Sequence, residues 1–480
     1  MAIKRTLSRY WMKHNNHGRS KPLVVYPKIP VFGHAIVQAH SPQGPIPPSN
    51  HNTFTSWAKV YTVFSVPLIQ AVQKQNKALA FEPIQAKFSV KLCGSSQEAY
   101  HILEEDMDTE NGKYGNIYLA MHQALNLGKT LNELNQAMAL RHHVNLATTD
   151  AVYGPHNPFQ NPNVEGAFWE FEREIPKLLY LPDWLARNGV RNRKLVADAF
   201  QNYFCNDYHK QASGLVQDFH TSEIAYGFSL SDRSLFEVGH ALAILANTSA
   251  AVFWTVFYVF STPGALREIR EEISTIITSS VDDANTRKHC IDMTKVNTNC
   301  PILVSTFREA IRLHSIGISL RQVCKDSVLD GTYYLRKDAM VLMPTAAIHT
   351  NPLVWGPDVL EFNYRRFHPS NPHKVSPAAF RSFGGGTTLC PGRHFATTQV
   401  MAWTIMLVTR FDMEPVVGQW VQPTTENTNL ANVMMSLDHD FHVEMSAREI
   451  YRDGNWSMRV TNNDAMFGAT VEDLEWREKE

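Results

Sequence analysis

The pattern of hydrophobic and polar residues predicts one long helix, shorter helices and a few strands. The most apolar stretch is residues 235–262, and within 241–260 only four polar residues interrupt it. A hydropathy filter would select this stretch as a membrane span. Its polar residues lie in the middle, however, and the surrounding chain has a soluble composition. We therefore expect a long buried helix in which Phe253 and Trp254 pack inward.

Shorter periodic segments complete the expected fold. Phe88–Leu92 alternates like a strand, residues 97–105 have the spacing of a short helix, and an apolar helix is expected from about 396 to 411. Residues 318–349 alternate like strands around Asp330-Gly331, which is a turn signal.

Composition and charge exclude several classes of function. The 480 residues are 44% hydrophobic and 11% aromatic, which is enough for a sizeable core. A formal charge of -1 gives no reason to expect a nucleic-acid partner. The six cysteines lie far apart without a C-x-x-C pair, so we predict no disulfides and a reducing compartment.

The two ends of the chain differ from its centre. No Asp or Glu precedes Glu82, basic residues crowd the start, and seven prolines within 22–48 predict an extended lead-in. Such a basic flank suits either an anionic membrane surface or a solvated tail. The start lacks an apolar leader, so we expect no signal peptide or membrane anchor in the sequence as given. We divide the chain into a lead-in at 1–50, a single domain at 51–450 and a tail at 451–480.

The stretch with the clearest chemistry runs from Phe383 to Ala396, with the sequence Phe-Gly-Gly-Gly-Thr-Thr-Leu-Cys-Pro-Gly-Arg-His-Phe-Ala. Cys390 ends a glycine-rich loop and precedes a helical pattern. Glycines let the backbone turn tightly beneath a flat ligand, and the N–H groups of the loop can then face the sulfur. A thiolate held in this way is a metal ligand. The alternative is a buried structural cysteine in a turn before a core helix.

This stretch resembles the haem-binding signature of the cytochrome P450 family. The resemblance implies that Cys390 is the axial ligand of the iron of a haem b, and that Phe383, Gly386 and Gly392 belong to the cofactor-binding loop. It also implies the P450 fold, which is mainly α with a small β region and in which one mostly helical domain binds the haem. We expect the small sheet to be built from residues near 60–92, near 318–345 and in the C-terminal segment. The domain at 51–450 would be that haem-binding domain.

One position departs from the family pattern. The residue two before the cysteine is usually basic in P450s and reaches a haem propionate, but here it is Thr388. The charge must then come from another residue. Our candidate is Arg321, because the corresponding P450 strand commonly offers an arginine to the haem edge. Arg393 is a weaker candidate, which would only cap the loop.

The long apolar helix supplies the second piece of chemistry that the resemblance implies. P450s run such a helix across the distal face of the haem, where an acid-alcohol pair relays protons to iron-bound oxygen. The pair here would be Asn247 and Thr248. An amide does not release a proton at neutral pH, so Asn247 would hold a water or a bound oxygen, and the Thr248 hydroxyl would act as the relay. The alternative is a satisfied polar kink in a core helix.

Residues 246–254 also point to a subgroup of the family. They resemble the P450s that include sterol 7-alpha-hydroxylase and prostacyclin synthase, in which an asparagine also replaces the acid. Members of that subgroup divide between oxygen insertion and rearrangement of peroxides. The resemblance to the subgroup therefore leaves the reaction open.

A glutamate-arginine pair precedes the cysteine at the distance that P450s keep. Glu309 and Arg312 lie three residues apart and share one helical face. The same spacing occurs at Glu170 and Arg173, so the spacing alone means little. Residues 347–367 resemble the family's meander, which implies that Arg366 joins Glu309 and Arg312 in a buried structural cluster below the haem.

Residues 178–186 form an apolar segment with a central proline and a tryptophan. In P450s the corresponding region caps the substrate entrance and often dips into the membrane surface. The alternative is a loop packed on the core. The resemblance implies that the loops at 100–125 and 178–190 line the substrate pocket.

Three hypotheses of function follow from the resemblance. The first is a monomeric monooxygenase that inserts one atom of O₂ into a lipid, terpenoid, sterol or other secondary metabolite. Its electrons would come from NADPH through a separate reductase, and it would lie on the cytoplasmic face of the endoplasmic reticulum if an anchor was removed, or otherwise in the cytoplasm. The second is a reductase-independent isomerase or dehydratase acting on a peroxide. The third is a non-catalytic haem-binding protein.

Overall fold

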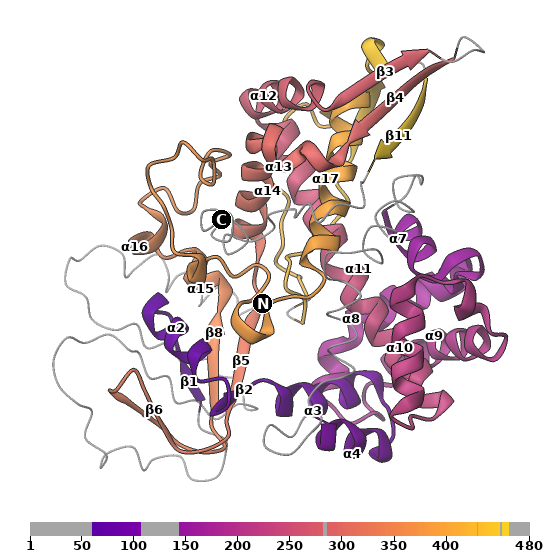
Figure 1. The fold of residues 1–480 in the computed structure, drawn as a ribbon, viewed down its shortest axis with the longest axis vertical. Coiled ribbons are helices and arrows are strands. Elements are labelled where there is room, and N and C mark those ends of the chain that lie inside the picture. Colours follow the sequence, from indigo (N-terminus) through magenta and orange to yellow (C-terminus); the bar gives the residue numbers. More distant parts are fainter. Residues whose placement is uncertain (1–59, 107–143, 282–285, 430, 452–453, 460–480) are drawn as a thin grey trace.

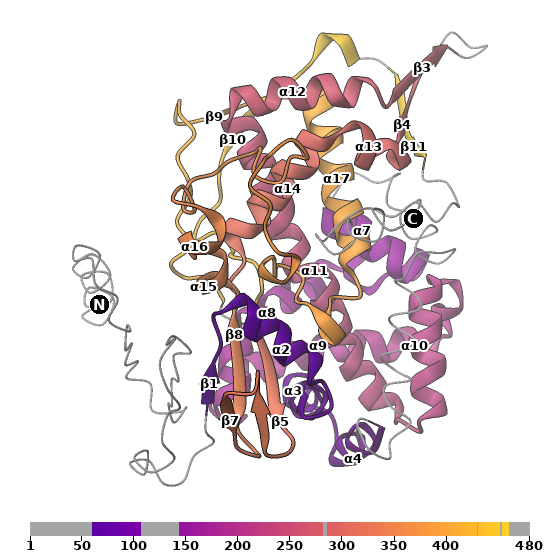
Figure 2. The same ribbon diagram turned by 60° about the vertical axis from the view of Figure 1, so that its left-hand side comes forward.

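The computed structural model describes residues 60–106, 144–281, 286–429, 431–451 and 454–459. The proline-rich lead-in at 1–50 lies outside these residues. Residues 460–480 of the tail and residues 107–125 of the expected pocket loop also lie outside them. Figure 1 shows a long helix, α11, running through the middle of the molecule. A small sheet lies on one side of α11 and a group of helices on the other, an arrangement that Figure 2 shows from a second side.

The helices dominate the described chain, as the resemblance implies. Their bounds are α2 (Val66–Lys74), α3 (Glu82–Cys93), α4 (Gln97–Asp106), α7 (Val144–Tyr153), α8 (Pro162–Tyr180), α9 (Arg187–Cys205), α10 (Gly214–Ala225), α11 (Leu230–Ser261), α12 (Pro263–Ser274), α13 (Val296–Asn299), α14 (Pro301–His314), α15 (Thr345–His349), α16 (Pro352–Trp355) and α17 (Arg393–Arg410). The helices expected near 97–105 and 396–411 are α4 and α17, so both predictions are confirmed.

Helix α11 is the long buried helix that the apolar stretch predicts. It begins where the Ser229 side chain accepts a hydrogen bond from the N–H of Asp232, and it ends before Pro263, which opens α12. Trp254 is fully buried, whereas Phe253 is half-buried against the same core. By length and hydropathy α11 could cross a membrane, but half of its apolar window is buried inside the molecule.

Within the described residues, the strands form four small sheets. Their bounds are β1 (Val60–Thr62), β2 (Leu79–Ala80), β3 (Ile277–Val281), β4 (Arg287–Asp292), β5 (Ile318–Val323), β6 (Ser327–Leu329), β7 (Tyr333–Leu335), β8 (Met340–Pro344), β9 (Phe411–Pro415), β10 (Val443–Ala447) and β11 (Asn455–Arg459). The four-stranded sheet has the order β1-β8-β5-β2, with β1 and β8 parallel and the other neighbours antiparallel.

The expected sheet is right in its first two regions and wrong in its third. Strands β1, β2, β5 and β8 come from residues near 60–92 and 318–345. The C-terminal strands do not join them, because β9 pairs with β10 and β11 pairs with β4. The predicted turn at Asp330-Gly331 is confirmed, since both residues have positive φ and join β6 to β7.

The prediction of a strand at Phe88–Leu92 is wrong, because these residues lie inside α3. Burial in α3 follows the helical period: Ala86, Leu92 and Cys93 are buried, while Phe88 is 43% exposed. A proline in the first turn and Gly94 at φ 70° after the last residue fix the two ends of the helix. The short alternation of apolar and polar residues at 88–92 therefore arises by chance within a helix.

The core that positions the site surrounds the C-terminal half of α11. Buried residues of α11, α12, α14 and α17 make up the largest cluster, which includes Trp254, Phe307 and Ile405. A second cluster joins α8 and α9 to the N-terminal half of α11. Helix α11 is therefore held along its whole length, and the loop before α17 is attached to the same core.

Candidate active site

The glycine-rich loop lies between the core and α17, and its own backbone closes it. The N–H of Cys390 donates to the carbonyl of Phe383 at 2.8 Å. Gly384 has φ 83°, and a Cβ there would lie 2.8 Å from the carbonyl oxygen of Thr388. No other residue fits this position without moving the loop.

The next glycines lie against α2 and an arginine. Gly386 has φ 62° and begins a single 3₁₀ turn, Gly386–Thr388. A Cβ on Gly385 would lie 2.6 Å from Nε2 of Gln73 and 3.1 Å from Nη1 of Arg381. With its amide oxygen turned toward them, Gln73 accepts from Arg381 Nη1 at 3.1 Å and from the N–H of Gly386 at 3.2 Å. The loop is therefore packed on both sides.

Cys390 presents its sulfur at the end of this loop, just before α17. The residue is half-buried, and burial raises the pKa of its thiol above the ordinary value. The N–H of Gly392 and the guanidinium of Arg393 act in the opposite direction and lower that pKa. A metal ion at the sulfur would supply the positive charge that makes the thiolate the stable form. This is the donor chemistry that an axial ligand requires.

Arg321 reaches the loop at the position where the resemblance expects a basic residue. It lies on β5 and is 2% exposed. Its Nη2 donates to Oγ1 of Thr388 at 2.7 Å, and its Nη1 donates to its neighbour's carbonyl, that of Leu320, at 2.7 Å. The positive charge is thus buried beside Thr388 although Thr388 itself carries none.

Sequence reasoning missed a second guanidinium beside the loop, that of Arg381. It is 1% exposed, and its Nη2 donates to Oγ of Ser319 on β5 at 3.0 Å. Arg381 stands two residues before Phe383, so the missing base at Thr388 could have drawn attention to it. A tight loop without Cβ atoms, a thiol at its end and two buried guanidinium groups fit a haem, whose propionates are anionic.

The two candidate residues of α11 make different contacts. Thr248 is 7% exposed, and its hydroxyl donates to the carbonyl of Ile244 at 3.0 Å. The side-chain oxygen of Asn247 accepts from the backbone N–H groups of Val433 at 2.9 Å and of Met434 at 3.1 Å. Since this oxygen is engaged, only the NH₂ group of Asn247 could serve a bound oxygen.

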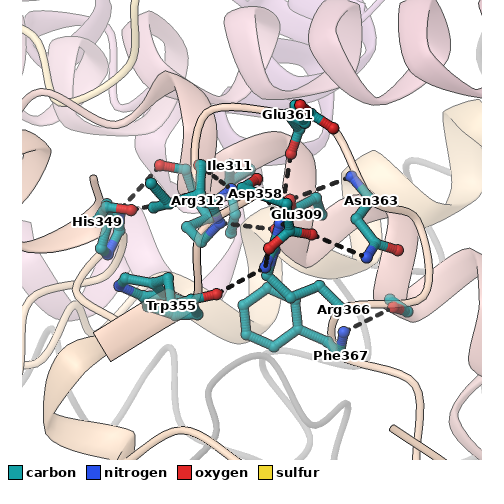
Figure 3. Close-up of polar contacts among 12 residues, drawn as sticks. Glu309, Ile311, Arg312, His349, Trp355, Asp358, Glu361, Asn363, Arg366 and Phe367 are labelled. Carbon is teal, nitrogen blue, oxygen red and sulfur yellow. Dashed lines mark hydrogen bonds and ion pairs between the residues drawn. The ribbon is translucent and has the colours of Figure 1, made fainter. Parts of the chain in front are cut away.

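The three residues of the expected cluster meet in the core, as Figure 3 shows. Arg312 donates to both oxygens of Glu309, from Nε at 2.7 Å and from Nη2 at 2.8 Å. Arg366 adds a bond from Nε to Oε1 of Glu309 at 2.9 Å. The side chains of Glu309 and Arg312 are fully buried. By contrast, Glu170 and Arg173, which have the same spacing, form an exposed ion pair.

Backbone carbonyls complete the cluster. Arg312 Nη1 donates to the carbonyl of His349 at 2.6 Å, and Arg366 Nη1 donates to that of Trp355 at 2.9 Å. Asp358 also accepts from Arg366, and this hydrogen bond lowers the pKa of the Asp358 carboxyl. Every charge of the cluster therefore has a partner, which is the condition for burying it.

His349 links this cluster to the glycine-rich loop. Its Nδ1 donates to the carbonyl of Arg312 at 2.9 Å, and its Nε2 accepts from the N–H of Arg381 at 2.8 Å. Burial lowers the pKa of His349 to about 3, so the ring is neutral with its proton on Nδ1. No local pattern in the sequence indicates this link, because the partners of His349 lie more than 30 residues away on either side.

The segment at 178–186 is a surface segment in this structure. It contains the end of α8 and the connection to α9. Leu178 and Ala186, at its two ends, are buried in the core, whereas several apolar side chains between them reach solvent. The exposed fractions are 55% for Tyr180, 64% for Trp184 and 50% for Leu185. These side chains are therefore not packed on the core.

A mainly helical fold with a cysteine-bearing glycine loop and a buried Glu-Arg-Arg cluster defines a haem-thiolate protein. The family model for cytochrome P450 matches residues 174–441 of the chain. The chain belongs to the cytochrome P450 family, and it is an oxidoreductase that incorporates oxygen. Its fold is accordingly the P450 fold, and the family implies a haem.

The relatives agree with the subgroup that the residues around Asn247 indicate. The chain is 28% identical over 493 residues to "Cytochrome P450 monooxygenase nodJ" of Hypoxylon pulicicidum, and the alignment covers 94% of each protein. It is 28% identical over 269 residues to "Cholesterol 7-alpha-monooxygenase" of Cricetulus griseus, covering 52% of each. It is also 28% identical over 182 residues to "Bifunctional cytochrome P450/NADPH--P450 reductase ALT2" of Alternaria alternata, covering 38% of this chain and 15% of that protein.

Proposed function

We propose that this protein is a haem-thiolate monooxygenase that inserts one atom of O₂ into an apolar small molecule. The observation that carries the proposal is the sulfur of Cys390 at the end of a closed glycine loop, with the N–H of Gly392 directed at it. When bound, haem b supplies an iron centre that activates dioxygen, and a thiolate ligand favours cleavage of the O–O bond.

The chain's own residues would hold the haem at its flat face and at its edge. Phe383, Gly386 and Gly392 form the loop under the macrocycle, and Cys390 ligates the iron. Arg321 and Arg381 would face the propionates, since charge-assisted bonds to carboxylates are the strongest that a guanidinium makes. The domain at 51–450 is then one haem-binding unit.

Thr248 is the residue that we assign to proton delivery. Its hydroxyl lies in the middle of α11 and donates to Ile244 in this structure. Rotation of the hydroxyl would let Thr248 donate to an oxygen on the distal side while a water restores its proton. Thr248→Ala should divert electrons from product into hydrogen peroxide and lower product formation by about 10²-fold or more. Thr248→Ser, which keeps the hydroxyl, should retain most of the coupling.

The substrate and the electron donor are proposed from the relatives. One relative is named for cholesterol and another is a monooxygenase of Hypoxylon pulicicidum, so we propose a sterol, terpenoid, lipid or other secondary metabolite. The name of the Alternaria relative joins a P450 to an NADPH-dependent reductase. We propose that this chain takes its electrons from such a reductase as a separate protein.

We further propose a monomer on a membrane surface. The exposed Tyr180, Trp184 and Leu185 offer an apolar contact, and Arg187 and Arg191 beside them can face anionic headgroups. The location that we propose is the cytoplasmic face of the endoplasmic reticulum if an anchor was removed, and otherwise the cytoplasm.

The experiment combines the haem-loaded enzyme, a P450 reductase, NADPH and labelled dioxygen with a panel of sterols, terpenoids and fatty acids. The proposal predicts a product that contains one labelled oxygen atom and that forms only when the reductase is present. An unlabelled product formed at full rate without reductase would instead identify a peroxide isomerase or dehydratase, the second hypothesis from the sequence.

A further inference from the structure

Two helices hold one irregular segment through polar side chains, one buried and one half-buried. The segment comprises residues 429 and 431–435, follows β9, and contains no helix or extended strand in its described part. Asn247 of α11 binds its second half, and Glu172 of α8 binds its first half. Asn247 lies 186 residues before Val433, and Glu172 lies 257 residues before Asn429.

The contact from α11 is made by one oxygen atom. Oδ1 of Asn247 accepts from the consecutive N–H groups of Val433 and Met434, at 2.9 and 3.1 Å. A carbonyl oxygen has two lone pairs, so a single amide satisfies both donors. An aspartate could accept the same two bonds, but it would place a charge in a half-buried site at a cost in free energy. The asparagine that replaces the family's acid is thus suited to a backbone contact.

The contact from α8 is made by a buried carboxylate. Glu172 is 9% exposed, and its Oε1 accepts from Nδ2 of Asn429 at 2.8 Å and of Asn432 at 2.7 Å. The backbone carbonyl of Glu172 also accepts from Nδ2 of Asn429, at 2.7 Å. Sequence analysis gave no reason to select Glu172, because its partners lie more than 250 residues away.

A third side of the segment is bound by the chain after α14. The N–H of Ile316 donates to the carbonyl of Val433 at 2.7 Å, and a Cβ on Gly317 would lie 3.1 Å from the Val433 side chain. The next residues form β5, which contacts Arg381 through Ser319 and carries Arg321. The segment therefore lies between the helix that carries Thr248 and the strand that contacts the haem loop.

We propose that Asn247 is a positioning residue and not a member of the proton relay. Together with Glu172 it clamps residues 429 and 431–434 at the substrate side of the haem, and the clamp fixes the wall against which a bulky ligand rests. This inference rests on the proposed function, because that function defines the substrate side. It also explains why α11 tolerates an amide where a relay would require an acid.

The test measures hydrogen exchange at the N–H groups of Val433 and Met434 in the full-length, haem-loaded enzyme. Asn247→Ala should raise their exchange rates about tenfold, since each N–H loses its acceptor. Asn247→Asp should keep the protection, because a carboxylate accepts the same bonds. Glu172→Ala should raise exchange at the side-chain NH₂ group of Asn432, because that group loses its acceptor, whereas Glu172→Gln should not raise it. Glu170→Ala, two residues away on the exposed face of α8, is the matched control.

Ligand affinity gives the second readout. Imidazole and 4-phenylimidazole both bind at a haem iron, but only the larger probe reaches the surrounding wall. In Asn247→Ala the affinity for 4-phenylimidazole should change at least threefold while that for imidazole stays constant, and Asn247→Asp should restore it. A role in proton delivery would leave both affinities unchanged.

The outcomes separate this inference from the proposed function. Unchanged exchange in Asn247→Ala, or exchange at Val433 and Met434 in the unaltered enzyme as fast as in an exposed loop, would overturn the clamp. The second result is available even if a variant fails to fold. Loss of haem-thiolate spectra in the unaltered enzyme would instead overturn the proposed function, whatever the exchange rates.

Discussion

At the scale of single residues, Glu309 differs from the other glutamate-arginine pairs in burial and not in spacing. Glu170 and Arg173 have the same separation but lie on the surface of α8. Glu309 lies in the core, where Arg312 and Arg366 neutralise it. Removal of one partner from such a cluster leaves buried charges without compensation.

We therefore predict that Glu309→Ala lowers the free energy of unfolding by roughly 3–5 kcal/mol and yields little haem-loaded protein. Denaturant unfolding and the ratio of haem to protein absorbance measure the two effects. Glu170→Ala is the control and should cost at most about 1 kcal/mol. Normal haem content in Glu309→Ala would show that the cluster does not position the loop.

His349 predicts a dependence of stability on pH. Burial lowers its pKa from 6.5 to about 3 in the folded protein, whereas the unfolded chain keeps the ordinary value. Below pH 6.5 the unfolded state binds a proton that the folded state does not bind. The free energy of unfolding therefore falls as the pH falls from 6.5 toward 3. Above pH 6.5 this group has no effect.

The predicted loss from His349 between pH 7 and pH 5 is about 2 kcal/mol. Urea unfolding at the two pH values measures it. His349→Gln removes the titrating group, so the difference between the two pH values should shrink by that amount, whereas the exposed His439→Gln should leave it unchanged. An equal pH dependence in His349→Gln and in the unaltered protein would show that His349 does not resist protonation.

The site was predictable from the sequence only where a local motif carries it. Cys390 and its glycines stand in one short run, so their spacing was enough to identify the loop. Arg381 and the bridge made by His349 depend on contacts between distant segments, which no local pattern records. The backbone partners of Asn247 were hidden for the same reason.

At the scale of elements, the length of a periodic pattern decided how well it predicted structure. The 32-residue helix α11 was recognisable because its apolar run is long. The five residues of Phe88–Leu92 were too few to distinguish a strand from one face of α3, and the capping residues at the two ends of α3 settle the matter. A short alternation is ambiguous because it fits either a strand or one face of a helix.

The connection between α8 and α9 carries a prediction at this scale. If Trp184 and Leu185 contact a membrane, the double variant with serine at both positions should bind vesicles of anionic phospholipid about tenfold more weakly or worse. Sedimentation with vesicles measures this binding. Leu353→Ser is the control, because Leu353 is 83% exposed on α16. An equal loss in both proteins would mean that the connection has no special affinity for membranes.

At the scale of the whole molecule, the fold class followed from composition and from the resemblance, but the pairing of strands did not. β11 pairs with β4 across more than 160 residues, and β1 pairs with β8 across 280. Such pairings depend on how the helices bring distant segments together. The same packing brings Cys390, Arg321, Arg381 and the Glu309 cluster to one place.

The measurement that tests this account most directly is the absorbance spectrum of the purified protein, reduced under carbon monoxide. Ligation of the haem iron by the thiolate of Cys390 predicts one haem b for each chain and a strongly red-shifted Soret band. Cys390→His should abolish that band. A red-shifted band that survives in Cys390→His, or its absence from the unaltered protein with haem bound, would contradict the assignment of Cys390 and with it the proposed chemistry.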